Sequence, residues 1–270
     1  MTGFSGKRVL VTGAGDGLGR GIARRFAREG ASVLIAEINR EAGQRTVSEI
    51  KAAGGIAVFV ETDVSSKAAV EACVAEAKIQ FGGLDVLVNN AAVLSPNILL
   101  EQKTDDMLEK VLRTGLWSTW WFMQASMPLM REQGGGRIIN FYSIDAESAA
   151  WLHADYNLTK AAIKSLTQSA AVEWARFNIL VNAIAPTGAG TVFAQLSNDI
   201  PGFADMAAGM NPMGRVGDPE EDIAPVVLFL ASEWSKYVTG ETIHVDGGIH
   251  LPRYNSRPQN LQELEDAKKV

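Results

Sequence analysis

Three side chains that can perform proton chemistry lie close together in the sequence: the hydroxyl of Ser143, the phenol of Tyr156 and the ammonium of Lys160. Tyr156 and Lys160 are four residues apart, so a helix beginning near residue 154 would place them on one face. A phenol has a pKa of about 10 and a nearby ammonium favours its ionised form, so Lys160 is placed to lower the pKa of Tyr156. Such a base, beside a serine that binds the substrate oxygen, suits proton removal from an alcohol or proton return to a carbonyl. The same spacing also occurs in helices with a half-buried tyrosine and a solvated lysine, so the rest of the chain must decide.

The elements that would position these groups follow from the apolar pattern. Runs of strand length alternate with stretches of helical period, and several of the runs are continuously apolar. This alternation predicts an α/β fold of the Rossmann type, a doubly wound parallel sheet in three layers. We expect strands at 8–12, 32–36, 56–61, 84–88, 136–142, 178–185 and 242–245, and helices at 17–29, 40–53, 66–81, 104–131 and 154–177.

The chain divides into few parts. Residues 1–250 are expected to form one dinucleotide-binding and catalytic domain, because no linker interrupts them. Within this domain, residues 191–214 have the length and mixed character of a substrate lid. Residues 251–270 form a polar extension, with a short helix expected at 261–269.

Composition and charge exclude several classes of function. The net charge of −6 and the absence of a basic stripe argue against nucleic acid as a partner. No apolar run reaches the roughly 18 residues of a membrane span, and the start of the chain does not resemble a signal peptide. The single cysteine, Cys73, excludes an intramolecular disulfide, so we expect a cytoplasmic protein. His153, His244 and His250 are scattered, and no metal site is expected.

A glycine-rich turn follows the first expected strand and leads into a helix. Glycines allow a tight turn and close approach of a ligand, while the helix N-terminus offers free N–H groups to a pyrophosphate. After the first strand of a βαβ unit, such a turn indicates dinucleotide binding, although it lacks the G-x-G-x-x-G frame. The candidate cofactor residues in this turn are Gly13, Gly15, Asp16, Gly17, Leu18 and Gly19.

The residue that follows the second strand, Glu37, bears on the choice of cofactor. A carboxylate at this point can accept hydrogen bonds from the adenosine ribose hydroxyls and would repel a 2′-phosphate. Asp16 adds negative charge, and Ile38 stands where an NADP site would be helped by a base. The sequence therefore favours NAD over NADP, with Arg40 as the one residue that could favour NADP. Asp63 and Val64 follow the third strand, and Asn90 and Ala91 the fourth, where simple turn chemistry is an alternative to cofactor binding.

Together, these motifs make the chain resemble the short-chain dehydrogenase/reductase (SDR) family over residues 6–248. The matching motifs are the glycine turn, Asp63-Val64, Asn89-Asn90-Ala91, Ser143 with Tyr156 and Lys160, Asn182-Ala183-Ile184-Ala185-Pro186, Thr191 and Val245-Asp246-Gly247-Gly248. Because the motifs occur in order, they identify the family where each motif alone is weak evidence.

The resemblance implies a role for each matching residue. Asp63 would bind the adenine, Asn90 and Ala91 would line the adenosine ribose, and Thr191 would contact the carboxamide or the phosphates. Lys160 would hold the nicotinamide ribose, Ser143 would bind the substrate oxygen, and Tyr156 would be the acid and base. The family commonly forms tetramers through two long helices. A homotetramer or homodimer is therefore expected, with Trp117, Trp120 and Trp121 at the interface.

Three positions depart from the family pattern. Leu112, three residues before Gly115, stands where members usually carry an asparagine that holds a water linked to the lysine. Thr114 or Ser118 could replace it, a backbone carbonyl could hold the water, or turnover could be reduced; we favour the backbone carbonyl. Ala92 and Thr187 replace usual glycines, but neither change removes a catalytic group.

The expected activity is hydride transfer between NAD and a secondary alcohol or ketone. Trp151 is expected to wall the substrate pocket, and Asp145 or His153 to recognise a polar substituent or face solvent. Phe193, Met206 and other apolar side chains of the lid favour a fairly large apolar substrate, such as a cyclic, terpenoid, steroidal or aromatic compound. The alternatives are a 3-oxoacyl-thioester reductase and a non-catalytic member of the fold that senses NAD(H).

Overall fold

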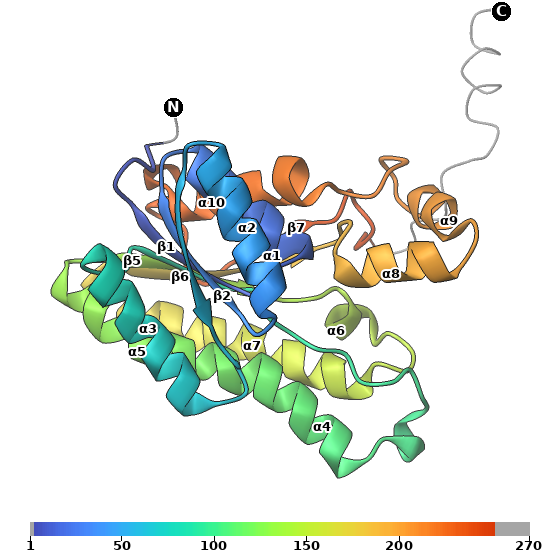
Figure 1. The fold of residues 1–270 in the computed structure, drawn as a ribbon. Coiled ribbons are helices and arrows are strands. Elements are labelled where there is room, and N and C mark those ends of the chain that lie inside the picture. Colours follow the sequence, from blue (N-terminus) through green and yellow to red (C-terminus); the bar gives the residue numbers. More distant parts are fainter. Residues whose placement is uncertain (1–2, 252–270) are drawn as a thin grey trace, which may run out of the picture.

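A computed structural model of the chain describes residues 3–251 and contains one parallel sheet between two layers of helices (Figure 1). Within these residues the sheet has seven strands in the order β3-β2-β1-β4-β5-β6-β7. The expected three-layer α/β fold is confirmed. The strands are β1 (Arg8–Thr12), β2 (Ser32–Glu37), β3 (Ile56–Glu61), β4 (Val86–Asn89), β5 (Gly136–Phe141), β6 (Ile179–Pro186) and β7 (Thr242–Val245).

The helices pack on both faces because the strands are apolar on both faces. In β1, Val9 and Val11 face one core, and Leu10 between them faces the other, as the period of two requires. The first core is covered by α1 (Gly17–Arg28), α2 (Arg40–Ala52) and α10 (Ala224–Ala231). The second core is covered by α3 (Lys67–Phe81), α5 (Ser118–Glu132) and α7 (Ala154–Trp174).

The order of the strands determines where a ligand can bind. The chain runs outward from β1 through β2 to β3, then returns to place β4 on the other side of β1. Crossover connections therefore leave in opposite directions from β1 and β4, which opens a crevice at their carboxyl ends. The helices α6 (Asp145–Ser148), α8 (Thr191–Asp199) and α9 (Phe203–Gly209) lie at this end of the sheet (Figure 1).

Some expected helices differ from the observed ones. The expected helix 104–131 is divided into α4 (Asp105–Leu112), a π-helical segment η2 (Arg113–Trp117) and α5. The helix expected to end at residue 177 ends instead at Trp174 and continues as a 3-10 turn. The segments η4 (Pro219–Ile223) and α10 were not expected, because α10 is apolar throughout and shows no helical period.

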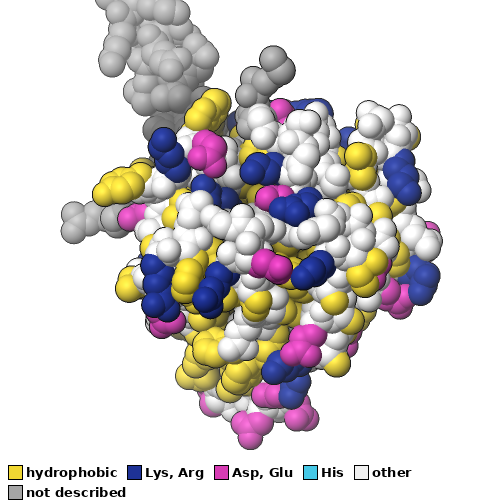
Figure 2. All heavy atoms as spheres, turned by 90° about the vertical axis from the view of Figure 1, so that its left-hand side faces the viewer, with side chains coloured by type: hydrophobic (Ala, Val, Ile, Leu, Met, Phe, Trp, Pro, Cys, Tyr) yellow, Lys and Arg dark blue, Asp and Glu magenta, His cyan; other side chains and the backbone are white. Residues whose placement is uncertain are grey.

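The rest of the surface adds little to the site. On the face opposite α8 and α9, basic and acidic side chains are interspersed, and neither charge forms a continuous stripe (Figure 2). Among the described residues, no helix combines the length and apolarity needed to cross a bilayer. Nor does this part of the chain hold a group of three or more His, Cys, Asp or Glu side chains arranged for a metal ion. Beyond Leu251, the expected polar extension lies outside the described residues.

Candidate active site

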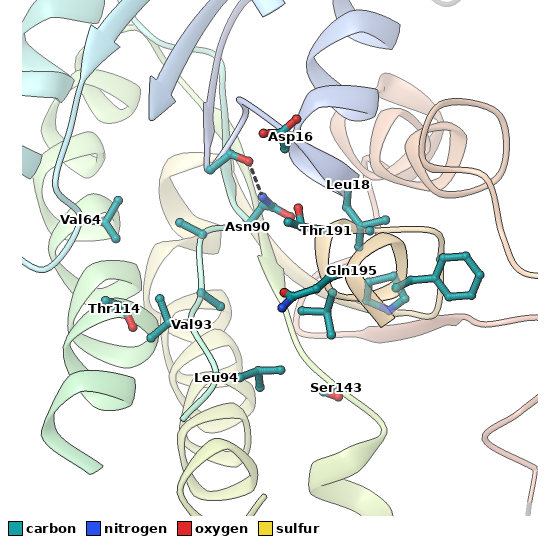
Figure 3. Close-up of a pocket in the computed structure, with 18 of the residues that line it drawn as sticks. Asp16, Leu18, Val64, Asn90, Val93, Leu94, Thr114, Ser143, Thr191 and Gln195 are labelled. Carbon is teal, nitrogen blue, oxygen red and sulfur yellow. Dashed lines mark hydrogen bonds between the residues drawn. The ribbon is translucent and has the colours of Figure 1, made fainter. Parts of the chain in front are cut away.

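A cavity of about 1170 Å³ lies at the carboxyl ends of the strands, where the strand order reverses (Figure 3). It is larger than the roughly 300–1,000 Å³ typical of a pocket for one small ligand, so it can hold a cofactor and a substrate side by side. One end is lined by residues that follow β1, β2 and β3, and the other by residues that follow β5 and β6. Of the residues expected in the site, those that line the cavity are Gly13, Asp16, Leu18, Glu37, Asp63, Val64, Asn90, Ala91, Ser143, Asp145, Thr191 and Phe193.

The glycine turn after β1 has the backbone shape that the sequence predicts. Gly13 and Gly17 have φ values of +62° and +55°, in the left-handed region that favours glycine. A side chain on Gly19 would place its Cβ 2.2 Å from the carbonyl oxygen of Gly13, so the helix could not approach the turn this closely. Gly15, Gly17 and Gly19 therefore shape the turn, while Gly13, Asp16 and Leu18 line the cavity. This cradle fits the pyrophosphate of a dinucleotide at the start of α1.

Asn90 and Thr191 hold the glycine turn in place. The Asn90 side chain donates hydrogen bonds of 2.8 Å and 3.1 Å to the backbone oxygens of Thr12 and Gly13 (Figure 3). A Cβ on Gly17 would lie 2.7 Å from Thr191 Oγ1, so the start of α8 packs directly against the turn. Asn90 thus uses its amide to join β4 to the turn, and it adds to the cavity wall from this fixed position.

Glu37 at the end of β2 is fixed beside the glycine turn. Its carboxylate accepts hydrogen bonds from the backbone N–H groups of Gly15, at 3.1 Å, and Asn39, at 3.0 Å. The two nearby arginines are bound to other carboxylates, Arg45 to Asp16 and Arg40 to Glu61. Arg40, which could have favoured NADP, is therefore paired with an acid.

Lys160 is buried within α7, with 3% of its surface exposed. Its ammonium donates a 2.7 Å hydrogen bond to the backbone oxygen of Phe141, at the end of β5. The nitrogen lies 5.4 Å from the centroid of the Tyr156 ring. Burial lowers the pKa of Lys160 to about 8, because the interior disfavours its charged form.

Tyr156 does not have the lowered pKa that we expected. Burial and the negative charge of Asp145 raise the pKa of Tyr156 to about 12, whereas a hydrogen bond with Ser143 lowers it. The sequence shows that Lys160 is one turn away on the same helix, but not that its ammonium is directed to Phe141. Further positive charge near the phenol is therefore needed to bring the pKa of Tyr156 down.

A buried ion pair positions the first turn of α7. Lys103 Nζ lies 3.0 Å from Asp155 Oδ1, and Ser95 donates a hydrogen bond to the same carboxylate. Asp155 also accepts a 3.0 Å hydrogen bond from the backbone N–H of Tyr156. The segment before α4 is thereby tied to the residue next to the phenol. No local pattern predicts this pair, because Lys103 and Asp155 are far apart in the sequence.

In family members an asparagine at the position of Leu112 usually accompanies a distortion of this helix. Here the helix is distorted although the residue is leucine. Leu112 is followed directly by the π-helical segment η2, whose wider turn changes the hydrogen bonding of the backbone. A Cβ on Gly115, within η2, would lie 2.6 Å from Thr159 Cγ2, so this glycine permits close packing on α7. Thr114 lines the cavity (Figure 3), and its hydroxyl donates a 2.8 Å hydrogen bond to the carbonyl of Lys110. The Thr114 hydroxyl is thus engaged within its own helix, which argues against Thr114 as the group that replaces the asparagine.

The substrate end of the cavity agrees only in part with expectation. Phe193 lines it, but Trp151 is 84% exposed and Met206 is 55% exposed, and neither lines the cavity. Both side chains are largely exposed outside the cavity, so the structure does not place Trp151 or Met206 in the substrate pocket. His153 lies behind the wall, with Nδ1 2.9 Å from Asp145 Oδ2 and Nε2 3.0 Å from Asn97 Oδ1.

Several residues that line the cavity had no signal in the sequence. Gln195, on α8, points across the cavity toward Val93 and Leu94 (Figure 3). Its position depends on how α8 folds back over the sheet, which no motif reports. The other lining residues that were missed include Ser95, Asn97, Ile144 and Ile249.

Comparisons with known proteins agree with this geometry. The family described as Enoyl-(Acyl carrier protein) reductase matches residues 13–250. A 2,5-dichloro-2,5-cyclohexadiene-1,4-diol dehydrogenase of Sphingobium indicum is 36% identical over 245 residues, 91% of this chain and 96% of that protein. A 3-oxoacyl-[acyl-carrier-protein] reductase of Staphylococcus aureus is 37% identical over 247 residues, 91% of this chain and 98% of that protein.

Solved structures give the same result. A Sinorhizobium meliloti protein assigned as a short-chain alcohol dehydrogenase has a TM-score of 0.84 at 32% identity, covering 91% of this chain and 96% of that one. An Agrobacterium tumefaciens protein assigned as a gluconate dehydrogenase has a TM-score of 0.85 at 32% identity, covering 92% and 97%. With the ordered motifs, the glycine cradle and these relatives in agreement, the chain belongs to the short-chain dehydrogenase/reductase family and is an oxidoreductase of that family.

Proposed function

We propose that the protein is an NAD-dependent oxidoreductase that transfers a hydride between nicotinamide and a secondary alcohol or ketone. The observation that carries this proposal is that Ser143 lines the cavity that also contains the dinucleotide cradle, and that Tyr156, hydrogen-bonded to Ser143, lies beside the buried Lys160. A serine, a phenol and a buried ammonium supply an oxygen-binding group, an acid and base, and a cation.

The roles of the three side chains follow from their positions. A nicotinamide dinucleotide bound in the cradle would accept or donate the hydride, and in its oxidised form it brings positive charge. Tyr156 takes the proton from the substrate hydroxyl, or returns it to the carbonyl oxygen. Ser143 hydrogen-bonds the same oxygen, and Lys160 holds the ribose hydroxyls while its charge favours the phenolate. Because burial raises the pKa of Tyr156 to about 12, we expect catalysis to need the positive charge of both Lys160 and the oxidised ring.

The choice of NAD over NADP is supported by Glu37 and its surroundings. A 2′-phosphate would be placed against a carboxylate that the backbone N–H groups of Gly15 and Asn39 already hold. Arg40 and Arg45 would have to leave Glu61 and Asp16 to bind it. The residues at the adenosine end therefore suit two ribose hydroxyls better than a phosphate.

The lining of the substrate end of the cavity supports a substrate with an apolar body and polar substituents. Apolar and polar side chains both face it; the lining includes Val93, Leu94, Ile144, Phe193, Leu196 and Ile249, and Ser95, Asn97, Asp145 and Gln195. The relative from Sphingobium is named for a chlorinated cyclic diol and the one from Agrobacterium for gluconate. A cyclic alcohol of moderate size fits the lining better than a wholly apolar steroid.

Two alternatives remain to be separated by experiment. The relative from Staphylococcus is named as a 3-oxoacyl-[acyl-carrier-protein] reductase, which keeps thioester reduction as a second candidate. A non-catalytic NAD(H) sensor is opposed by the presence of Ser143, Tyr156 and Lys160 in one site, although Leu112 departs from the family pattern.

The first experiment is a panel of cyclic alcohols and ketones assayed with NAD(H) and NADP(H), with a 3-oxoacyl thioester included. We expect turnover of alcohols with NAD, and near-complete loss of turnover in Tyr156→Phe while NADH fluorescence still reports binding. Retained turnover in Tyr156→Phe would refute the role of the phenol. Preference for the thioester with NADPH would support the second candidate, and NADH binding with no turnover would support the sensor.

We further propose a homo-oligomer, a tetramer or a dimer, formed through α5 and α7. Trp117 and Trp120 are 42% and 40% exposed, and Leu158 on α7 is also exposed. Trp117 stacks on Trp121 with ring centroids 6.0 Å apart, which makes a broad aromatic surface. Sedimentation of the wild type and of Trp120→Glu tests this: a monomeric wild type contradicts it, and dissociation of the variant supports it.

A further inference from the structure

Asp145 is the acidic side chain nearest the oxygen-binding serine in the sequence, and it lines the substrate end of the cavity. Its backbone N–H donates a 3.2 Å hydrogen bond to Ser143 Oγ, so the carboxylate and the serine hydroxyl belong to one short turn. It is also linked to the phenol through His153, which hydrogen-bonds the carboxylate and whose ring centroid lies 6.1 Å from that of Tyr156. A substrate bound to Ser143 therefore lies next to a carboxylate.

The carboxylate is held from one side only. Its Oδ2 oxygen is 2.9 Å from His153 Nδ1, and because a carboxylate can only accept, His153 donates this hydrogen bond. The second nitrogen of His153, Nε2, is 3.0 Å from the side-chain amide of Asn97, so the ring is contacted at both edges. Within residues 3–251 no hydrogen bond is found to the other carboxylate oxygen, Oδ1. One acceptor oxygen is thus fixed in the cavity wall and remains available.

The helix that carries Asp145 is fixed as well. Glu147, on the same short helix α6, accepts from Lys164 at 3.2 Å and lies 3.0 Å from His244 Nε2. These contacts join α6 to α7 and to β7. A binding group on a helix that is fixed in this way keeps its geometry when the substrate enters, which favours specific recognition.

A carboxylate beside the phenol has a chemical cost. Negative charge at Asp145 opposes ionisation of Tyr156, so it hinders proton removal from a simple alcohol. A hydrogen-bond donor on the substrate would partly neutralise the charge of Asp145, so that this charge opposes the ionisation of Tyr156 less. The cavity is also lined by Asn97 and Gln195, neutral polar groups that suit hydroxyls.

We propose that Asp145 binds a second hydroxyl of the substrate, so that the preferred alcohol is a diol or polyol. This inference rests on the proposed function and specifies its substrate class. The reacting carbon gives its hydride to the nicotinamide and the attached hydroxyl gives its proton to Tyr156, which leaves a hydroxyketone. The second hydroxyl keeps its proton and donates it in a hydrogen bond to Asp145.

The test compares kcat/KM with NAD for matched six-membered rings. Cyclohexanol is the reference, and the 1,2-, 1,3- and 1,4-cyclohexanediols carry the second hydroxyl at increasing spacing. The methyl and methoxy cyclohexanols of the same spacing match the diols in size but cannot donate a hydrogen bond. We expect at least one diol to exceed its methyl and methoxy counterparts by tenfold or more, as expected for a hydrogen bond to a charged acceptor.

The variants Asp145→Asn and Asp145→Ala are compared by the ratio of diol to methoxy activity within each protein. This ratio removes any common change in proton transfer at Tyr156. We expect the ratio of diol to methoxy activity to fall partly in Asp145→Asn and to fall to near one in Asp145→Ala. The His153→Gln variant keeps the carboxylate of Asp145, so it is expected to lower this ratio less. Circular dichroism and thermal melting confirm folding of each variant, and Asp145→Asn keeps the side-chain shape if Asp145→Ala does not fold.

Each outcome decides the matter. Turnover of cyclohexanol with no diol preference overturns this inference and leaves the proposed function standing. A diol preference unchanged in both Asp145 variants also overturns it. A stronger preference for aminocyclohexanols than for diols shows that Asp145 binds a cation and not a hydroxyl. A panel with no turnover of any alcohol or ketone overturns the proposed function and this inference together.

Discussion

Replacing Lys160 by methionine is expected to change the stability of the nucleotide-free protein in a pH-dependent way. The pKa of Lys160 is lowered from its ordinary 10.5 to about 8 by burial. One pKa unit corresponds to about 1.4 kcal/mol, so charging this side chain in the folded protein costs about 3 kcal/mol more than in the unfolded chain. The hydrogen bond to Phe141 offsets part of this cost, by about 1.5–3 kcal/mol for a charged donor.

The sign follows from proton binding. Between pH 8 and 10.5 the unfolded chain keeps the proton on Lys160 while the folded protein releases it, so wild-type stability rises with pH. Below pH 8 Lys160 is charged in both the folded and the unfolded protein, so the full cost of burying its charge is present. The Lys160→Met variant should then be about as stable as the wild type. By pH 10.5 the cost is gone, and the variant should be less stable than the wild type by about 3 kcal/mol more than at pH 7.

Urea unfolding at pH 7, 8, 9 and 10.5, followed by circular dichroism, measures this difference. Subunit concentration and ionic strength are kept constant, because assembly also adds to apparent stability. Lys164→Met is the matched control: it removes an ammonium one turn further along α7, where the side chain is partly exposed and paired with Glu147. If the stability difference for Lys160→Met stayed constant from pH 7 to 10.5, or moved in the opposite direction, the burial argument would be wrong.

Three further predictions concern the cofactor cradle and the distorted helix. Leu112→Asn is expected to leave kcat unchanged or raise it, because η2 forms without asparagine; a large loss of turnover in a folded variant contradicts this. Glu37→Ser should raise the KM for NAD and reduce the preference for NAD over NADP by roughly tenfold, as for loss of a charge-assisted hydrogen bond; an unchanged preference in initial-rate assays speaks against a role for this carboxylate. Gly115→Ala should lower stability by about 1–3 kcal/mol through overpacking against Thr159 Cγ2. Adding Thr159→Ser, which removes that methyl group, should restore much of the loss in thermal unfolding, and no rescue would place the strain elsewhere.

The sequence by itself determined the fold and the candidate chemistry of this protein. Strands apolar on both faces can be buried only between two layers of helices, and alternation with helices requires parallel pairing. The carboxyl ends of parallel strands lie at one edge, so motifs that follow successive strands must meet there. For this reason the sequence alone predicts that Gly13, Glu37 and Ser143 line one cavity, as they do.

Only the tertiary structure decided how these groups act on one another. Burial and Asp145 raise the pKa of Tyr156, and neither influence can be inferred from the spacing of four residues to Lys160. Residue type favours Trp151 and Met206 as pocket residues, but in the folded chain both side chains are largely exposed. Burial and orientation depend on contacts between segments far apart in the chain, and the local sequence pattern does not predict these contacts. The sequence therefore determines which three groups are present, the phenol, the ammonium and the serine hydroxyl. The packing of the folded chain determines the pKa values of the phenol and the ammonium.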